Sequence, residues 1–320
     1  MSFCLSALKN ICTVASCGTG QKKLFILIYH RVLNEFDPMN PSEVDKAIFT
    51  WQMALLKKHF NVLSLHDGIQ ALNAGSLPPR AVCITFDDGY ADNLLNAVPI
   101  LSANQLPATF FIASDYLDGG IMWNDRIIET IRHLSQVSLD LSALQLGVYD
   151  IETVQNKSSV ASEIVAKVKH LEVNERQACV DYIANLAAAL PSDLMLTAAQ
   201  LKQLSESGME VGGHTLSHPI LATLNAEQAN HEIAQNKLIL EGILGKPIRY
   251  FAYPNGKPGQ DYLPEQVDMV KQSGYEAAVS TLWGVSDKKT DQWQLARATP
   301  WDRTPERFMM RMAAVYSGIQ

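Results

Sequence analysis

Short runs of apolar residues alternate along the chain with longer segments in which apolar residues recur at helical spacing. The runs are rich in strand-forming residues and are apolar on both faces, which is typical of strands buried in a parallel sheet. They lie at 24–29, 62–65, 81–86, 108–113, 209–213, 250–253 and 277–280. The helical segments lie at 47–60, 67–73, 91–103, 197–207, 226–244, 263–273 and 305–315. This order predicts an α/β protein built from βα units around a parallel sheet or barrel.

The alternation is interrupted between Met122 and Leu190, where the pattern predicts helices and no strand. Because strand–helix order resumes afterwards, we interpret this stretch as an insertion within one domain. The expected organisation is an N-terminal segment over 1–23 and a single barrel domain over 24–320, with a helical insertion at about 122–190. A chain of 320 residues is long enough for a barrel, which typically needs about 250 residues.

Composition and charge limit the expected binding partners and the expected cellular compartment of the protein. The net charge of −7, without a long basic run, argues against nucleic acid or an anionic membrane surface as the main partner. No apolar stretch reaches the roughly 18 residues of a membrane-spanning helix. The five cysteines are widely spaced and odd in number, which favours a reducing, cytoplasmic location. The alternative is a secreted or lipid-anchored form, because residues 14–17 loosely resemble a lipoprotein cleavage site.

Two adjacent carboxylates, Asp87 and Asp88, follow the strand expected at 81–86 and precede Gly89. Neighbouring side chains of an extended chain point in opposite directions. One carboxylate can therefore bind a metal ion while the other faces the water that attacks the substrate. The alternative is a solvated turn, for which Asp-Gly is a common pair.

Two histidines, His214 and His218, follow the strand expected at 209–213. Pro219 disfavours a helix at this point, so we place the pair on a strand-to-loop turn. One Asp and two His form a typical catalytic ligand set with an open position. Such a set suits one divalent ion, with Zn²⁺ expected first and Co²⁺, Ni²⁺ or Fe²⁺ as alternatives. The alternative is a pair of histidines that only fill a loop.

Two further candidates lie at expected strand ends. His30 follows the first strand and is a candidate proton donor, although a lone His after an apolar run is more often structural. The segment 251–256 is by itself an ordinary turn after a strand. Beside a metal site, a backbone N–H in this segment can donate to a developing oxyanion.

Taken together, these motifs resemble the polysaccharide deacetylases, carbohydrate esterase family 4, over about Leu24 to Arg297. The Thr-Phe-Asp-Asp-Gly and His-x-x-x-His motifs carry the resemblance in this order. The early Tyr29-His30-Arg31 is similar to the branch whose motif order is permuted, which includes exopolysaccharide poly-N-acetylglucosamine deacetylases. The resemblance implies a deformed (β/α)7 barrel.

The resemblance also implies roles for individual residues. Asp87 would be the general base and His30 the general acid. The backbone N–H of Asn255 would help to form the oxyanion hole. The metal would be held by Asp88, His214 and His218.

The chain departs from the family pattern at three points. Ala252 stands where the family often has an Arg, so either Arg297 or Arg31 is expected to orient Asp87 instead. Asn255 stands where a Tyr is usual, which keeps a backbone donor and loses a ring from the groove wall. No clear Asp-x-Trp motif follows the last expected strand.

The sequence therefore predicts a metal-dependent hydrolase that removes N-acetyl groups from an amino-sugar-containing polysaccharide, oligosaccharide or glycan precursor. One alternative is a related amidohydrolase that acts on a ureide or a non-sugar amide, because one barrel supports many reactions. Another alternative is a carbohydrate-binding homologue without turnover. Trp123, Asn124 and Asp125 of the insertion are expected to line the substrate groove.

Overall fold

A nearly closed parallel barrel organises the chain in the computed structural model, which describes residues 2–18 and 22–319. The strand order within this part of the chain is β1 (Leu24–Tyr29), β5 (Ala81–Phe86), β6 (Thr109–Ile112), β9 (Glu210–Gly213), β10 (Tyr250–Ala252), β11 (Ala277–Trp283) and β12 (Leu295–Arg297). The two ends of the sheet meet where the Ile28 N–H donates to the Ala298 carbonyl, at 3.2 Å, and the Ala298 N–H donates to the Ile26 carbonyl, at 3.0 Å. The predicted α/β class and deformed (β/α)7 barrel are confirmed.

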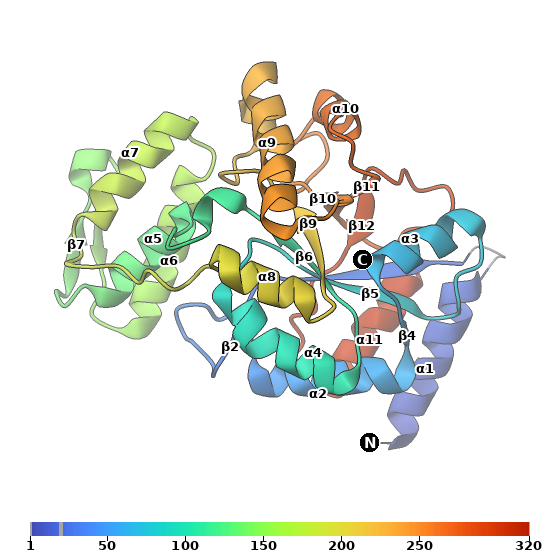
Figure 1. Cartoon of the computed structure of the whole chain (residues 1–320). Coiled ribbons are helices and arrows are strands. Elements are labelled where there is room, and N and C mark those ends of the chain that lie inside the picture. The colour runs from blue at the N-terminus through green and yellow to red at the C-terminus, as the bar shows by residue number, and fades with distance from the viewer. Residues whose placement is uncertain (1, 19–21, 320) are drawn as a thin grey trace.

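Burial on both faces explains the continuous apolar runs of the strands. All six residues of β1 and all six of β5 are buried. Inside the core, the rings of Tyr29, Phe86 and Phe110 stack in series, with centroids 5.3 Å and 4.6 Å apart. The helices that surround the sheet in Figure 1 are α2 (Lys46–His59), α3 (Leu65–Ala74), α4 (Val98–Asn104), α8 (Ala198–Glu206), α9 (Ala226–Leu244), α10 (Pro264–Gln272) and α11 (Pro305–Tyr316).

The insertion forms a compact lobe beside the barrel, at the left of Figure 1. It contains α5 (Trp123–His133), α6 (Val154–Val168) and α7 (Val173–Ala184) around its own apolar cluster. The prediction of helices without strands was wrong, because β7 (Ser138–Asp140) and β8 (Val148–Asp150) form an antiparallel hairpin. Strands of three residues are too short to produce a recognisable alternating pattern.

Three other elements differ from the sequence prediction. The strand expected at 62–65 is only β4 (Asn61–Val62), because Ser64 caps α3 by accepting the Asp67 N–H at 3.0 Å. The helix expected at 91–103 begins with a π-helical segment over Asn93–Ala97. Strand β12 was not predicted, since it contributes only three residues.

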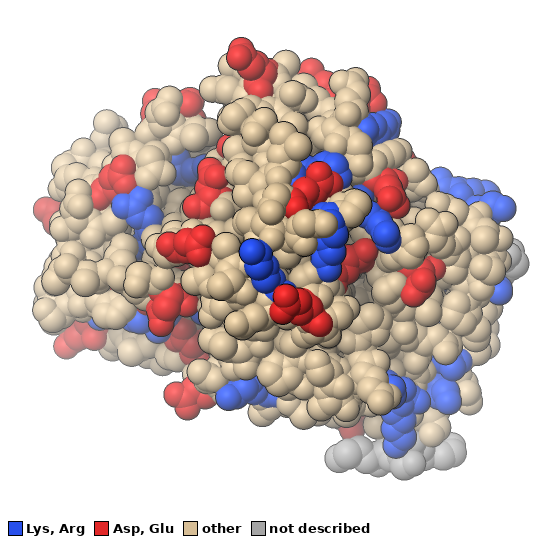
Figure 2. All heavy atoms as spheres, viewed as in Figure 1, with Lys and Arg blue, Asp and Glu red and all other residues tan. Residues whose placement is uncertain are grey.

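The N-terminal helix α1 (Ser2–Cys17) packs against α11. It is also tied to the barrel by the Arg80 N–H, which donates to the Ser16 hydroxyl at 2.9 Å. The division into an N-terminal segment and one barrel domain stays a prediction. Among the described helices, none has the length and apolar composition needed to cross a bilayer. Acidic and basic side chains are interspersed over most of the face seen in Figure 2.

Candidate metal and catalytic site

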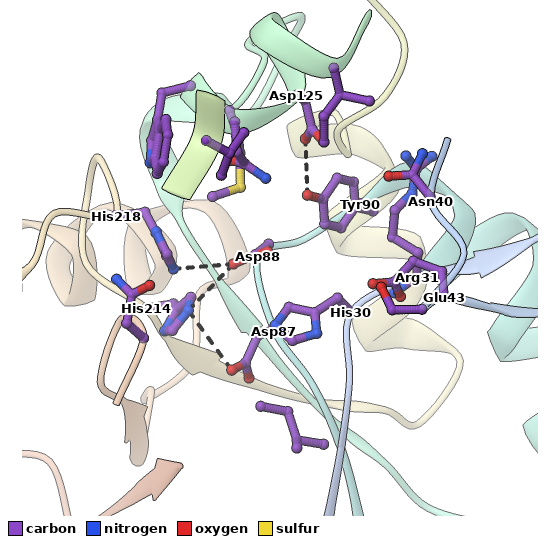
Figure 3. Close-up of a pocket in the computed structure, with 18 of the residues that line it drawn as sticks. His30, Arg31, Asn40, Glu43, Asp87, Asp88, Tyr90, Asp125, His214 and His218 are labelled. Carbon is purple, nitrogen blue, oxygen red and sulfur yellow. Dashed lines mark hydrogen bonds and ion pairs between the residues drawn. The ribbon is translucent and has the colours of Figure 1, made fainter. Parts of the chain in front are cut away.

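The predicted site residues converge at the mouth of the barrel, where the carboxyl ends of the parallel strands meet. Asp87 and Asp88 follow β5, and His214 and His218 follow β9. They line one wall of a cavity of about 430 Å³, whose lining also includes His30 (Figure 3). Active sites of α/β barrels occupy this end of the strands.

Three side chains meet at one point in a way that fits a divalent ion. Asp88 Oδ1 lies 3.4 Å from His214 Nε2 and 3.5 Å from His218 Nε2. Ligand atoms about 2.1 Å from a tetrahedral zinc ion are separated by about 3.4 Å, so the spacing matches. Asp88 Oδ1 is buried and has no hydrogen-bond partner in the described part of the chain, as expected for a ligand atom. We therefore take Asp88, His214 and His218 as a candidate metal site.

Hydrogen bonds to strand β10 and to helix α9 orient His214. Its Nδ1 lies 2.7 Å from the Ala252 carbonyl, so Nδ1–H donates there and Nε2 is left with its lone pair facing Asp88. The His214 N–H donates to Asn236 Oδ1 at 3.1 Å, and Asn236 Nδ2 donates to the Thr215 carbonyl at 2.6 Å. Sequence reasoning missed Asn236. The only signal was one polar residue on the buried face of helix α9.

Strained backbone is concentrated at the same place. Asp88, Thr215, His218 and Asn255 have φ values of 77°, 65°, 54° and 60°. Asp and Asn adopt this left-handed region more readily than most residues, but for the β-branched Thr215 it is an outlier that the surrounding contacts must hold. The Thr215 hydroxyl provides one of these contacts by accepting the His218 N–H at 3.1 Å.

The second carboxylate, Asp87, is held by Arg297 of β12. The guanidinium donates from Nη1 to Oδ1 and from Nη2 to Oδ2, both at 2.7 Å. Its Nε donates to the Ser280 carbonyl at 2.9 Å, and this further hydrogen bond fixes the orientation of the guanidinium. Burial alone would raise the pKa of Asp87, but the charge and hydrogen bonds of Arg297, together with the charges of His214 and His30, outweigh it and keep that pKa below its ordinary value. Asp87 is therefore an ionised, oriented carboxylate.

Arg31 has a different partner from the one considered in the sequence. Its Nε donates to Asp92 Oδ2 at 2.8 Å, and the guanidinium lies over the Tyr90 ring at 4.7 Å. Of the two arginines expected to orient Asp87, Arg297 does so and Arg31 does not. Asp92 also accepts the Val32 N–H at 3.0 Å, so its carboxylate lies at the loop after β1, next to Arg31.

His30 projects into the same cavity from the end of β1 (Figure 3). Its carbonyl accepts from Asn93 Nδ2 at 2.8 Å, and the next N–H in the chain donates to Glu43 Oε2 at 3.1 Å. Burial lowers the pKa of His30, but the charges of Asp88, Glu43 and Asp87 outweigh it and raise the pKa above the ordinary value. The imidazole can therefore carry a proton near neutral pH.

Asn255 lies across the cavity, after β10. Its carbonyl accepts from the Thr281 hydroxyl at 2.6 Å. Within residues 2–18 and 22–319, no hydrogen bond engages its backbone N–H. The N–H is therefore available to a ligand in the cavity.

The insertion supplies the opposite wall of the cavity. Trp123, Asn124, Asp125 and Lys169 line it, so the placement expected for the first three is confirmed. Asp125 accepts from the Tyr90 hydroxyl at 2.9 Å. Burial raises the pKa of Asp125 to about 7.

Comparisons with known proteins agree with this arrangement. The family model described as Polysaccharide deacetylase matches residues 74–278. The Bacillus subtilis (strain 168) protein YxkH is 22% identical over 276 residues, which cover 86% of this chain and 70% of YxkH. The poly-beta-1,6-N-acetyl-D-glucosamine N-deacetylase of Staphylococcus epidermidis is 30% identical over 168 residues, 45% of this chain and 57% of that enzyme.

A solved structure has the same fold at low sequence identity. The Streptococcus pyogenes deacetylase PplD, in complex with acetate, superposes with a TM-score of 0.62 at 18% identity. The superposition covers 92% of this chain and 99% of PplD. The shared fold therefore extends over most of both chains.

Proposed function

The chain belongs to the polysaccharide deacetylase family of hydrolases, which act on non-peptide carbon–nitrogen bonds, and we propose that it removes the N-acetyl group from an amino sugar within a glycan. The observation that carries the proposal is the site itself. Asp88, His214 and His218 converge to within ligand distance of one point, beside the separately held carboxylate of Asp87. Metal-assisted hydrolysis of an amide uses both a metal site and a base of this kind.

The ion would be held by Asp88, His214 and His218, with Zn²⁺ as the first expectation from the mixed N/O ligand set. When bound, such an ion polarises a carbonyl and lowers the pKa of water. The proposed role of Asp87 is to accept a proton from the attacking water. Arg297 keeps the Asp87 carboxylate ionised and fixed in direction, so little reorganisation is needed during the reaction.

The remaining roles fall to the groups on the other walls of the cavity. In this proposal the free N–H of Asn255 donates a hydrogen bond to the oxygen that becomes negative as the carbonyl is attacked. His30, protonated, gives its proton to the sugar nitrogen as the carbon–nitrogen bond breaks. Proton acceptor and donor thus come from different strands and face one cavity.

The relatives support the proposed substrate class. The Staphylococcus epidermidis relative is named for deacetylation of poly-β-1,6-N-acetyl-D-glucosamine, and PplD was solved with acetate, the product of such a reaction. We propose N-acetylglucosamine polymers or oligomers as substrates on that basis.

The test is an acetate-release screen on purified protein loaded with Zn²⁺, Co²⁺ or Ni²⁺. The substrates are N-acetylglucosamine oligomers with β-1,4 or β-1,6 links, and a cyclic ureide serves as the competing amide. We expect acetate from a sugar oligomer and loss of this activity after treatment with a chelator. Hydrolysis of the ureide alone, or no acetate with any of the metals, would contradict the proposal.

A further inference from the structure

A second, smaller hollow adjoins the catalytic cavity on the side of the candidate acid. It encloses about 150 Å³. The two hollows share the lining residues Ile28, His30, Ser42, Glu43 and Thr299. The two hollows are therefore immediate neighbours, and His30 lies in the lining of both.

The outer wall of this second hollow carries a tryptophan. Trp301 lines the hollow and keeps 46% of its surface exposed. It stacks on Trp283 of β11, with ring centroids 5.3 Å apart and planes inclined by 27°. Thr281, two residues before Trp283, lines the catalytic cavity, so β11 connects the ring pair with the site.

Among the residues that the structure describes, the ring and the guanidinium that contact Trp301 belong to Trp283 and Arg311. The guanidinium of Arg311 lies 4.9 Å from the Trp301 centroid and 5.9 Å from the Trp283 centroid. If Arg311 and Trp283 covered opposite faces of Trp301, the distance from Arg311 to Trp283 would be nearly twice as long. Both therefore lie on the same side, and the other face of Trp301 is turned away from them.

Arg311, which contacts both tryptophan rings, is itself held by an ion pair. Asp302 binds the Arg311 guanidinium through both of its oxygens, at 2.5 Å and 3.0 Å. A rigid aromatic ring loses little conformational entropy when a ligand packs on it. Ligand pockets commonly combine aromatic side chains with a few polar groups, and Trp301 offers such a ring beside the polar cavity. A pyranose ring suits such a surface, because its C–H bonds form an apolar face and its hydroxyls point outward.

We propose that Trp301 is the platform of a second sugar subsite, on which the unit next to the reacting amino sugar stacks. The substrate is then a chain of two or more sugars, which runs from the metal site past His30 to Trp301. This inference rests on the proposed function for the position of the reacting sugar, and the hollow and the ring pair support it independently.

The test compares N-acetylglucosamine with its tetramer on zinc-loaded protein. We expect Trp301→Ala to raise KM for the tetramer about tenfold with kcat within about twofold, the scale of one lost aromatic contact, and to leave monomer kinetics unchanged. Trp301→Phe keeps a ring and should restore most of the affinity. Tyr182→Ala, which removes an aromatic side chain that is 41% exposed on α7, is the matched control and should change neither substrate.

Calorimetric binding to the Asp87→Asn variant separates this inference from the proposed function. If no acetate is released by any protein, the proposed function fails, and the subsite is still tested by binding. Tighter binding of the tetramer than of the monomer, lost when Trp301→Ala is added, supports the subsite. Equal affinity for the two ligands, or an equal effect of Trp301→Ala on both, overturns it.

Discussion

Arg297 and Asp87 form a buried two-point ion pair across the barrel mouth, although 210 residues separate them in the sequence. The guanidinium side chain has no exposed surface and the carboxylate side chain has 4%. Arg297 stands on the strand that closes the sheet against β1, so closure of the barrel and orientation of the proposed base depend on the same three-residue strand.

Replacing Arg297 should therefore alter both the chemistry and the stability. Arg297→Met removes the charge that keeps the pKa of Asp87 low. We expect the acidic limb of the pH profile of kcat/KM to move to higher pH, and the free energy of unfolding to fall by about 3–5 kcal/mol, as for other broken buried pairs. Arg297→Lys keeps a charge and should show a smaller shift. An unshifted acidic limb in folded Arg297→Met would show that Arg297 does not set the ionisation of Asp87.

The role of His30 can be separated from the metal site by the choice of leaving group. His30→Ala should lower kcat for the N-acetyl sugar by about 10²–10⁴-fold, the usual range for a general acid. It should also remove the basic limb of the profile, because we expect the wild type to lose activity as pH rises through the His30 pKa. An acetate ester with a 4-nitrophenolate leaving group needs no protonation and should be much less affected. Equal losses on both substrates would argue for a structural role.

Asp125 of the insertion should make the free energy of unfolding depend on pH, and this effect can be measured without an activity assay. Burial raises the pKa of Asp125 from 3.8 to about 7, so the folded state holds a proton that the unfolded state releases between these pH values. The free energy of unfolding should then fall as pH rises from about 4 to about 7, by up to about 1.4 kcal/mol per pH unit.

Asp125→Asn cannot titrate and should lack this component. Denaturant unfolding of both proteins from pH 4 to pH 8 measures the difference. Parallel stability profiles would mean that Asp125 keeps an ordinary pKa in the folded protein.

The strand-end motifs could be predicted because each is local. Asp87 and Asp88 directly follow a six-residue buried strand, and the His214–His218 pair follows another. The parallel arrangement then brings both motifs to one edge. The zinc preference, the residue roles and the cytoplasmic location stay predictions.

The supporting residues could not be predicted, because they act across long sequence separations. Asn236 lies 22 residues from the backbone N–H of His214 that it binds. The helical spacing of apolar residues in α9 predicts that Asn236 is buried, but not which group it contacts. The sequence left Arg31 and Arg297 as equal candidates, and the choice depended on Asp92, which pairs with Arg31 across 61 residues of sequence. The short strands β7, β8 and β12 depend on tertiary pairing, which a three-residue pattern does not reveal.

The division of labour between Asp88 as metal ligand and Asp87 as base is tested by measuring bound metal and acetate release together in the wild type, in Asp87→Asn and in Asp88→Ala. We predict that Asp87→Asn keeps about one divalent ion per chain while acetate release falls by about 10²–10⁴-fold, provided that circular dichroism shows a folded protein. We predict that Asp88→Ala loses both the ion and the activity. Wild-type turnover in Asp87→Asn, or an undiminished metal content in Asp88→Ala, would contradict this division of labour.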